Sequence, residues 1–382
     1  MGERLSGRAR AIIAVVGAAL LIPLGATAPA GAATPEPKNS DADVRAVELG
    51  KPEKIRAFKS ETTSSDVGTA AVDCSLGQAN HDRVTSCSYY RIPVIFTINE
   101  QPAGTANLYS KATAELDPRN RYQWRQRVEL RLTDPSTPAA YAVTGRVGYD
   151  CNYCDVDESG PQLLTPGTTR TYDFTMSSPG RQLVNDSIIP YATLDAPGFD
   201  EGSAYIGEVF RPRCDNTPRV TPVRFGGCVY PDVPPIWQVS VRNPRVDAVA
   251  WHIDWAQRNL NQPWGVPGSR YPLHRTFDQA LQIANRNVAC GPDVPRPPNR
   301  PDLSCDEYPF AQTYEGASRN PDYSCHFLDR QDNSREGSLR RSFLNSLRTL
   351  ENDAFYVEVT GKESATAPAP PSVRGPVGCG SD

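Results

Sequence analysis

The chain has 382 residues, with 40 lysines and arginines against 44 aspartates and glutamates, and a formal net charge of -4 at pH 7. That balance argues against a tight, polycationic nucleic-acid binder, because such domains usually carry a basic field. It does not exclude an enzyme that holds phosphates only transiently. The length predicts about two domains.

The N-terminal residues have the organisation of a secretory signal. Arg4, Arg8 and Arg10 precede an apolar run at residues 11–24, and the small residues of APAGAA follow. This order predicts a signal peptide over residues 1–33. The apolar run is too short for a confident membrane span, and no later stretch approaches that length. We therefore expect a secreted, extracellular protein with no membrane span.

Ten cysteines in an exported chain predict a disulfide framework. Short separations suggest four pairs and leave two cysteines over: Cys74–Cys87, Cys151–Cys154, Cys214–Cys228 and Cys290–Cys305, with Cys325 and Cys379 remaining. Spacing does not prove this connectivity. A zinc site at Cys151 and Cys154 would need a second ligand pair, which the neighbouring residues do not offer.

The first half of the mature chain predicts a linker followed by strands. Residues 34–73 are polar and lack a sustained period, which predicts a disordered linker or prosegment. Over residues 74–213, segments such as RIPVIFTINEQ and YQWRQRVELRLTD alternate apolar and polar residues between turn residues. This pattern predicts an N-terminal all-β, sandwich-like domain. The sequence does not indicate a partner for this domain, and we find no catalytic motif within it.

The pattern changes near Cys228, where amphipathic helices begin. DAVAWHIDWAQRNL offers Asp247 as an N-cap, and TFDQALQIANRNVACG offers Thr276. A third helix, within residues 337–350, has an apolar face that excludes Arg340 and Arg341. AFYVEV, at residues 354–359, predicts a closing strand. We therefore expect a multi-domain chain in which residues 214–361 form an α+β domain and residues 362–382 form a Pro/Ala-rich tail.

Polar side chains collect at three places in this second domain. CDEYP supplies Asp306 and Glu307, with Glu315 shortly after; DRQDNSREGS supplies Asp332, Asn333 and Arg335; and the first helix supplies His252. Paired carboxylates beside an amide suit Mg²⁺, which prefers oxygen ligands. Such an ion would offset the repulsion between adjacent acids and lower the pKa of an attacking water.

These residues also carry a resemblance. CDEYPFAQTYEG resembles the DEWP or DEYP signature of the NucA/NucB family of secreted bacterial deoxyribonucleases, including the Glu-Gly pair at its end. In the same order, HIDWAQ resembles that family's upstream His-Ile helix, and DN…GS, with Asn333, Gly337 and Ser338, resembles its Asp-Asn-Arg plus Gly-Ser turn. AFYVEV resembles its final strand. The resemblance covers about residues 228–361, with N-terminal extensions that the small members of the family lack.

The resemblance implies a metal-assisted endonuclease that cuts DNA with little sequence preference. It makes Asp306 and Glu307 the leading catalytic and metal-associated pair, with Mg or Mn as cofactor. Asn333 becomes a ligand or orienting residue, Glu315 a secondary candidate, and His252 a base or a structural partner. After Ser338 the small members carry Trp and then amides, whereas this chain has Leu339 to Phe343, so no amide role is carried into that helix.

Each assignment has a plainer alternative. Adjacent Asp and Glu are common on solvated surfaces, His252 faces an apolar stripe and fits a core histidine, and Asn333 fits a turn cap. Arg335, Arg340 and Arg341 are candidates for DNA phosphates, but a solvated helix face explains such arginines equally well. Glu315 fits a loop anchor.

Two further hypotheses compete with a secreted, divalent-metal-dependent deoxyribonuclease. The first is an exported binding or inhibitory protein that retains the nuclease scaffold without activity. The second is a ribonuclease. The departure after Ser338 and the acidic net charge favour the first of these modestly.

Overall fold

The computed structural model describes residues 43–54, 59–60, 72–180, 182–220, 225–362 and 379–381. The expected signal peptide lies outside the described residues, as do most of the expected linker and most of the C-terminal tail. None of the helices in the described part of the chain has the length and apolar character needed to cross a membrane.

The N-terminal half is built from strands alone, apart from one short 3-10 helix at Pro138–Tyr141. One sheet has the order β2-β3-β4-β5-β6-β9, and β1 also pairs with β4. A second sheet has the order β12-β11-β7-β8, and a third the order β10-β13-β14. The strands are β1 (Arg45–Leu49), β2 (Lys59–Ser60), β3 (Gln78–His81), β4 (Thr85–Ile98), β5 (Gln101–Glu115), β6 (Trp124–Thr133), β7 (Thr144–Cys151), β8 (Gln162–Leu163), β9 (Thr169–Met176), β10 (Leu183–Asn185), β11 (Ile188–Asp195), β12 (Gly202–Tyr205), β13 (Arg213–Asp215) and β14 (Gly227–Val229).

The alternating pattern explains how these sheets form one core. Inward residues of β4, β5 and β6, such as Ile92, Leu108 and Val128, lie in the same buried cluster as Val147 of β7 and Leu194 of β11. Successive side chains of a strand point to opposite faces, so each strand contributes every second residue to this cluster. The all-β character expected of the N-terminal region is confirmed.

One part of the expected linker is instead ordered. β1 pairs antiparallel with β4 over its whole length, and Val47 is 2% exposed within the core. The prediction of disorder over residues 34–73 is therefore wrong for Arg45–Leu49. The backbone hydrogen bonds of this polar segment to β4 and the burial of Val47 keep it in place. Local composition does not reveal either contact.

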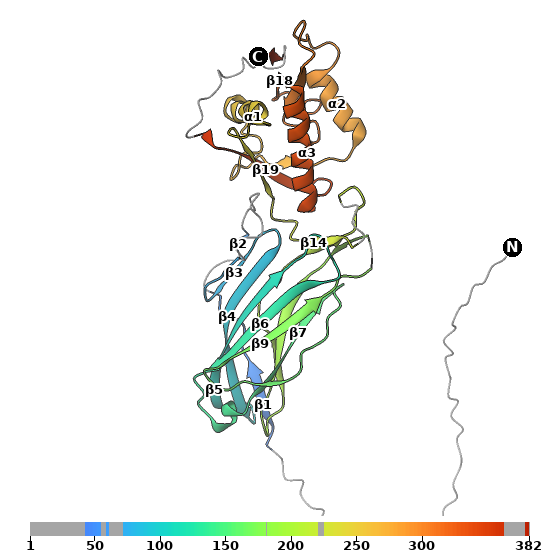
Figure 1. Ribbon diagram of the computed structural model, residues 1–382. Helices are drawn as coiled ribbons and strands as arrows, with labels where there is room; N and C mark the ends of the chain where they lie inside the picture. Colours follow the sequence, from blue (N-terminus) through green and yellow to red (C-terminus); the bar gives the residue numbers. More distant parts are fainter. Residues whose placement is uncertain are drawn as a thin grey trace, which may run out of the picture. The chain divides into compact units, whose positions relative to one another are not determined.

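The C-terminal half contains three helices and two small sheets. The helices are α1 (Asp247–Asn259), α2 (Gln279–Cys290) and α3 (Arg330–Ser346), and Figure 1 shows them grouped with β18 and β19. One sheet has the order β15-β19-β16 and the other the order β17-β18-β20. Their strands are β15 (Ile236–Ser240), β16 (Leu273–His274), β17 (Leu303–Tyr308), β18 (Ser324–Asp329), β19 (Ala354–Thr360) and β20 (Gly380–Ser381).

The helix starts differ from the sequence predictions. α1 begins at Asp247 itself, so this residue is not the N-cap, and the cap of α2 is Asp278 rather than Thr276. α3 begins at Arg330, because the Asp329 carboxylate accepts hydrogen bonds from the backbone N–H groups of Gln331 and Asp332. The polar run before Gly337 is therefore the first two turns of the helix and not a turn before it.

All ten cysteines are paired. The four pairs suggested by short spacing are present, and the two remaining cysteines form the fifth bridge, Cys325–Cys379.

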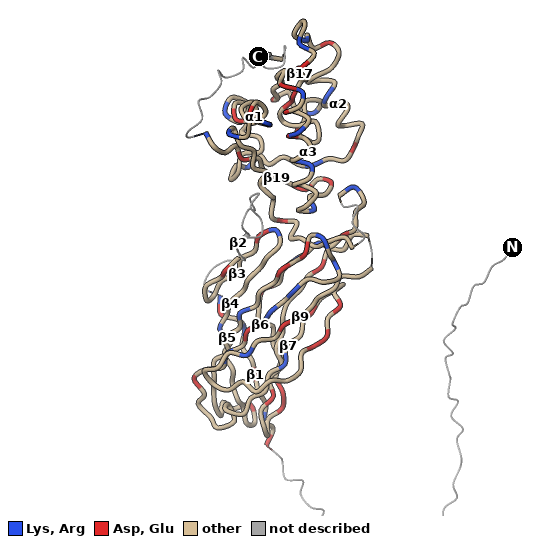
Figure 2. Tube along the Cα trace, viewed as in Figure 1, with Lys and Arg blue, Asp and Glu red and all other residues tan. Residues whose placement is uncertain are grey.

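Lysines and arginines are interspersed with acidic residues along the described chain and do not form one block (Figure 2).

Candidate active site

The candidate site is built on two paired strands and the helix that follows them. β17 runs antiparallel to β18, and Asp306 lies opposite His326 in the ladder. Asp329 both ends β18 and caps α3, so the helix starts directly from the strand pair. This arrangement brings the CDEYP motif of β17 and the DNSREGS run of α3 onto one small scaffold.

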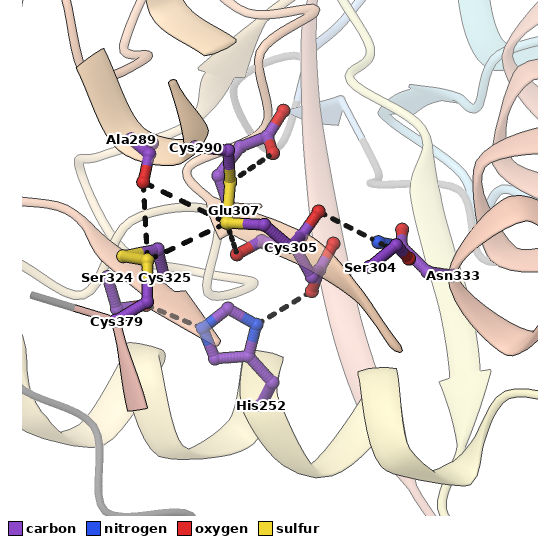
Figure 3. Close-up of a disulfide and its surroundings, with 11 residues drawn as sticks. His252, Ala289, Cys290, Ser304, Cys305, Glu307, Ser324, Cys325, Asn333 and Cys379 are labelled. Atoms are coloured by element: carbon purple, nitrogen blue, oxygen red, sulfur yellow. Dashed lines mark hydrogen bonds and ion pairs between the residues drawn. A yellow bond between two sulfur atoms is a disulfide. The ribbon is translucent and has the colours of Figure 1, made fainter. Parts of the chain in front are cut away.

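Asp306 is held from the side by a histidine of α1. Its Oδ2 atom accepts a hydrogen bond from His252 Nδ1 at 2.7 Å, and His252 Nε2 lies 2.9 Å from the hydroxyl of Ser324 (Figure 3). The Asp306 residue is 5% exposed and His252 is 0% exposed. Within the described chain, Asp306 Oδ1 accepts no hydrogen bond. The structure therefore brings together Asp306 and His252, two residues that the sequence analysis selected from segments far apart.

Glu307 faces the other side of the strand. Adjacent side chains of a strand point to opposite faces, and Glu307 Oε2 lies 3.4 Å from Cys290 Sγ at the end of α2 (Figure 3). Burial, together with the charge of Asp306, raises the pKa of Glu307 from 4.5 to about 7, although Arg286 and Arg340 oppose the shift. The two adjacent acids therefore point to opposite faces of β17, and a cation shared by Asp306 and Glu307 stays a prediction.

The raised pKa gives a stability prediction for Glu307→Gln. Because the folded pKa of Glu307 lies above the ordinary value, its contribution to stability is greatest below about pH 4.5 and is lost as the pH rises through about 7. The variant, which cannot ionise, should therefore gain stability relative to the wild type between pH 4.5 and pH 8. Thermal unfolding of variant and wild type at pH 4.5 and at pH 8 measures this gain in stability, with Glu115→Gln, at an exposed site, as the control. A difference in melting temperature that stays constant with pH would contradict the prediction.

Asn333 ties the first turn of α3 to β17. Its side-chain N–H donates to Ser304 Oγ at 3.1 Å and to the Cys305 carbonyl at 3.0 Å. Arg335, one turn away, pairs with Asp332 at 3.4 Å and also donates to the Arg245 carbonyl. Asn333 thus has an orienting position beside the strand, whereas Arg335 lies at the partly exposed surface of the helix.

The structure adds one acid that the sequence analysis missed. Glu336 is 1% exposed; it accepts hydrogen bonds from Trp237 Nε1 at 3.3 Å and from Arg340 Nε at 2.9 Å. Burial raises its pKa, the pairing with Arg340 opposes this, and the negative charge of Asp306 raises it further. Glu336 therefore shares the electrostatic surroundings of Asp306. Its spacing of three residues from Asn333 places both on one helical face, a signal that becomes readable once the helix is known to begin at Arg330.

Arg340 is not at a solvated face. It is 6% exposed, pairs with Glu336, and its guanidinium lies 3.5 Å from the centroid of the Phe310 ring. The buried face of α3 is formed by Glu336, Arg340 and Leu344, while Leu339 of the same helix is 41% exposed. The ion pair lets two charged residues occupy that face, which an apolar-periodicity argument cannot predict. Arg341 is exposed, as a residue that meets a phosphate would be.

Glu315 belongs to a separate pair. Its two carboxylate oxygens accept hydrogen bonds from the backbone N–H of His274, at 2.8 Å, and from His274 Nδ1, at 2.7 Å. The hydrogen bond to Glu315 raises the pKa of His274, against the effect of burial. Glu315 therefore anchors the loop after β17 to β16, and no contact recorded for it in the described chain reaches Asp306.

Asp306 and Glu336 are acids of β17 and α3 whose charges affect each other. Among the described residues nothing donates to Asp306 Oδ1, whereas Glu336 is paired with Arg340. Mg²⁺ is usually held by one or two carboxylates and keeps several waters. The compact three-ligand clusters in the described chain all contain disulfide-bonded cysteines, which cannot act as thiolate ligands.

Comparison with known proteins places this geometry in a family. No curated protein matches the chain. A family model described as Deoxyribonuclease NucA/NucB matches residues 273–358. The matched region contains Asp306, Glu336 and the whole of β17, β18 and α3, whereas His252 and Trp237 precede it. Over residues 273–358, the C-terminal region of the chain is therefore similar to the NucA/NucB deoxyribonuclease family.

Proposed function

We propose that the chain is an exported, divalent-metal-dependent endonuclease that hydrolyses the phosphodiester bonds of DNA with little sequence specificity. The observation that carries the proposal is the Asp306 carboxylate inside the matched region, which His252 holds on one oxygen and whose other oxygen has no hydrogen-bond partner among the described residues. The five disulfides agree with export, since such bridges persist in oxidising compartments.

In this proposal Asp306 supplies the base. Oδ1 accepts a proton from water, the water oxygen forms a bond to phosphorus, and the bond from phosphorus to the leaving ribose oxygen breaks. That oxygen takes up a proton, so the products are one phosphate monoester end and one hydroxyl end. His252 keeps Oδ2 occupied and the carboxylate oriented, and Asn333 keeps α3 against the strand that carries Asp306.

The cation fits beside the same carboxylate. Glu336 would hold it next to Asp306, whose Oδ1 stays available to the water, and a bound divalent ion would stabilise the charge that develops on the phosphate oxygens. Arg340 already neutralises Glu336 in the structure, and its contact with the face of Phe310 fixes where that positive charge lies. The buried acids thus remain compatible with a site that binds a polyanion.

The test is a cleavage assay on the purified full chain. We expect nicking of supercoiled plasmid DNA in Mg²⁺ or Mn²⁺, and loss of nicking when EDTA is added. An RNA substrate in parallel distinguishes a deoxyribonuclease from a ribonuclease or a dual nuclease. Absence of cleavage with every divalent metal, together with retained DNA binding in a gel-shift assay, would instead support a binding protein on an inactive scaffold.

A further inference from the structure

The N-terminal all-β region holds the nuclease-family region through a fully buried arginine. Arg83, between β3 and β4, is 0% exposed. Its Nε donates to the Leu347 carbonyl at 3.0 Å, and its Nη2 donates to the Arg348 carbonyl at 3.0 Å and to Asp353 at 3.1 Å. Its Nη1 donates to three further carbonyls in residues 230–233. One side chain thus joins a β-region loop to the turn that follows α3.

Two more arginines join the two regions, one from each region. Arg213 of β13 meets both carboxylate oxygens of Asp353 at 2.7 Å and also donates to the Arg348 carbonyl at 2.6 Å. Arg348 in turn pairs with Asp215 of β13, and both side chains are 0% exposed. Arg83, Arg213, Arg348, Asp215 and Asp353 are called the arginine clamp below. Such two-pronged pairing suits guanidinium and carboxylate geometry.

The three arginines of the clamp surround two aspartates, and the pKa of one of these aspartates is lowered. Burial alone would raise the pKa of Asp353, but the hydrogen bonds and charge of Arg213, with the charge of Arg83, outweigh it and lower that pKa. Removing the β region would take from Arg348 and Asp353 the side chains of Asp215, Arg83 and Arg213 that hold the turn at residues 347–353. Cys214 pairs only with Cys228, yet the clamp still opposes independent folding of the C-terminal part.

The clamp connects to the site through Arg275. The backbone N–H of Arg275 donates to the Asp353 carbonyl at 3.0 Å, and its guanidinium donates to Thr349 and to Asn345 of α3. Arg275 lies near enough to Arg340 for the two positive charges to interact, and Arg340 pairs with Glu336. Hydrogen bonds therefore run from the β region, through the turn at residues 347–353 and Arg275, to Asn345 of α3, the helix that also carries Glu336.

We propose that the N-terminal all-β region acts as a built-in partner of the nuclease region, and that Arg83 and Arg213 are positioning residues that set α3, and with it Glu336, through the turn at residues 347–353. The effect on catalysis depends on the proposed function, whereas the effect on α3 does not. Chains of packed side chains and hydrogen bonds can carry such coupling, and the clamp with Arg275 supplies such a chain to α3.

The experiment uses the full chain and the indole N–H of Trp237, which donates to Glu336. We prepare Asp353→Asn and the milder Arg213→Lys, with Arg127→Lys as matched control, because Arg127 pairs with Asp173 on an exposed face (56% and 63% exposed). The Trp237 resonance in tryptophan-labelled protein, identified by its absence in Trp237→Phe, reports the position of Glu336. Both clamp variants should shift it, and the control should not.

Cleavage kinetics give the second readout. Well below each melting temperature, both clamp variants should lower kcat by about 2- to 30-fold with little change in KM. If they lower the melting temperature but leave the Trp237 resonance and kcat at wild-type values, the clamp is structural only and the inference is overturned. If the wild type cleaves nothing, the proposed function fails, and the resonance alone decides whether the β region sets α3.

Discussion

Asp306→Asn should reduce DNA cleavage by about 10²- to 10⁴-fold, the range expected when a general base is removed. The substitution keeps the shape of the side chain but removes the charge that Oδ1 needs to accept a proton. Initial rates of plasmid nicking in Mg²⁺ measure the loss, with the wild type and the variant assayed over the same range of enzyme concentrations. Because Asp306 is 5% exposed and bonded to His252, thermal unfolding must show that the variant remains folded.

Glu307→Gln is the matched control for this result. The two acids are neighbours in sequence, but Glu307 faces α2 and the disulfide of Cys290, away from His252. We therefore expect Glu307→Gln to retain most of the cleavage rate that Asp306→Asn loses. Equal loss in both variants would restore the paired-acid mechanism, and full activity of Asp306→Asn would remove this residue from the chemistry.

The second large effect concerns stability. Arg348→Met should destabilise the protein by about 3–5 kcal/mol, because it leaves the fully buried Asp215 carboxylate without its partner. Arg348 also donates to the Pro118 carbonyl, which loses that hydrogen bond. Urea denaturation at pH 7, with the slope compared between variants, measures the change.

A double variant separates this explanation from a role in DNA binding. Arg348→Met combined with Asp215→Leu removes the uncompensated charge and should recover part of the lost stability. If Arg348 instead contacts phosphates, as an arginine near the end of a basic helix could, Arg348→Met would leave stability unchanged and weaken the salt-dependent binding of DNA. That outcome would contradict the buried pair.

Several features follow from local sequence alone. Alternation of apolar and polar residues marks β4, β5 and β6, because a strand between core and solvent exposes every second side chain. Cysteines separated by 3 to 15 residues pair with each other, since short loops bring them together. The CDEYPFA motif and its order relative to DN…GS point to the same family whose model matches residues 273–358.

The tertiary structure decided which charged residues are buried and what they face. Arg83 and Asp353 are 270 positions apart, and neither the burial of Arg83 nor the acceptors it meets in the described part of the chain can be read from a periodic pattern in the sequence. Glu336 and Arg340 form an ion pair on a buried helical face, where apolar periodicity predicts leucine. The sequence by itself determined the strands, the short-range disulfides and the motif, because these depend on residues that are near in the chain. Which charged side chains are buried depends on partners far away in the sequence, and only the folded chain brings those partners together.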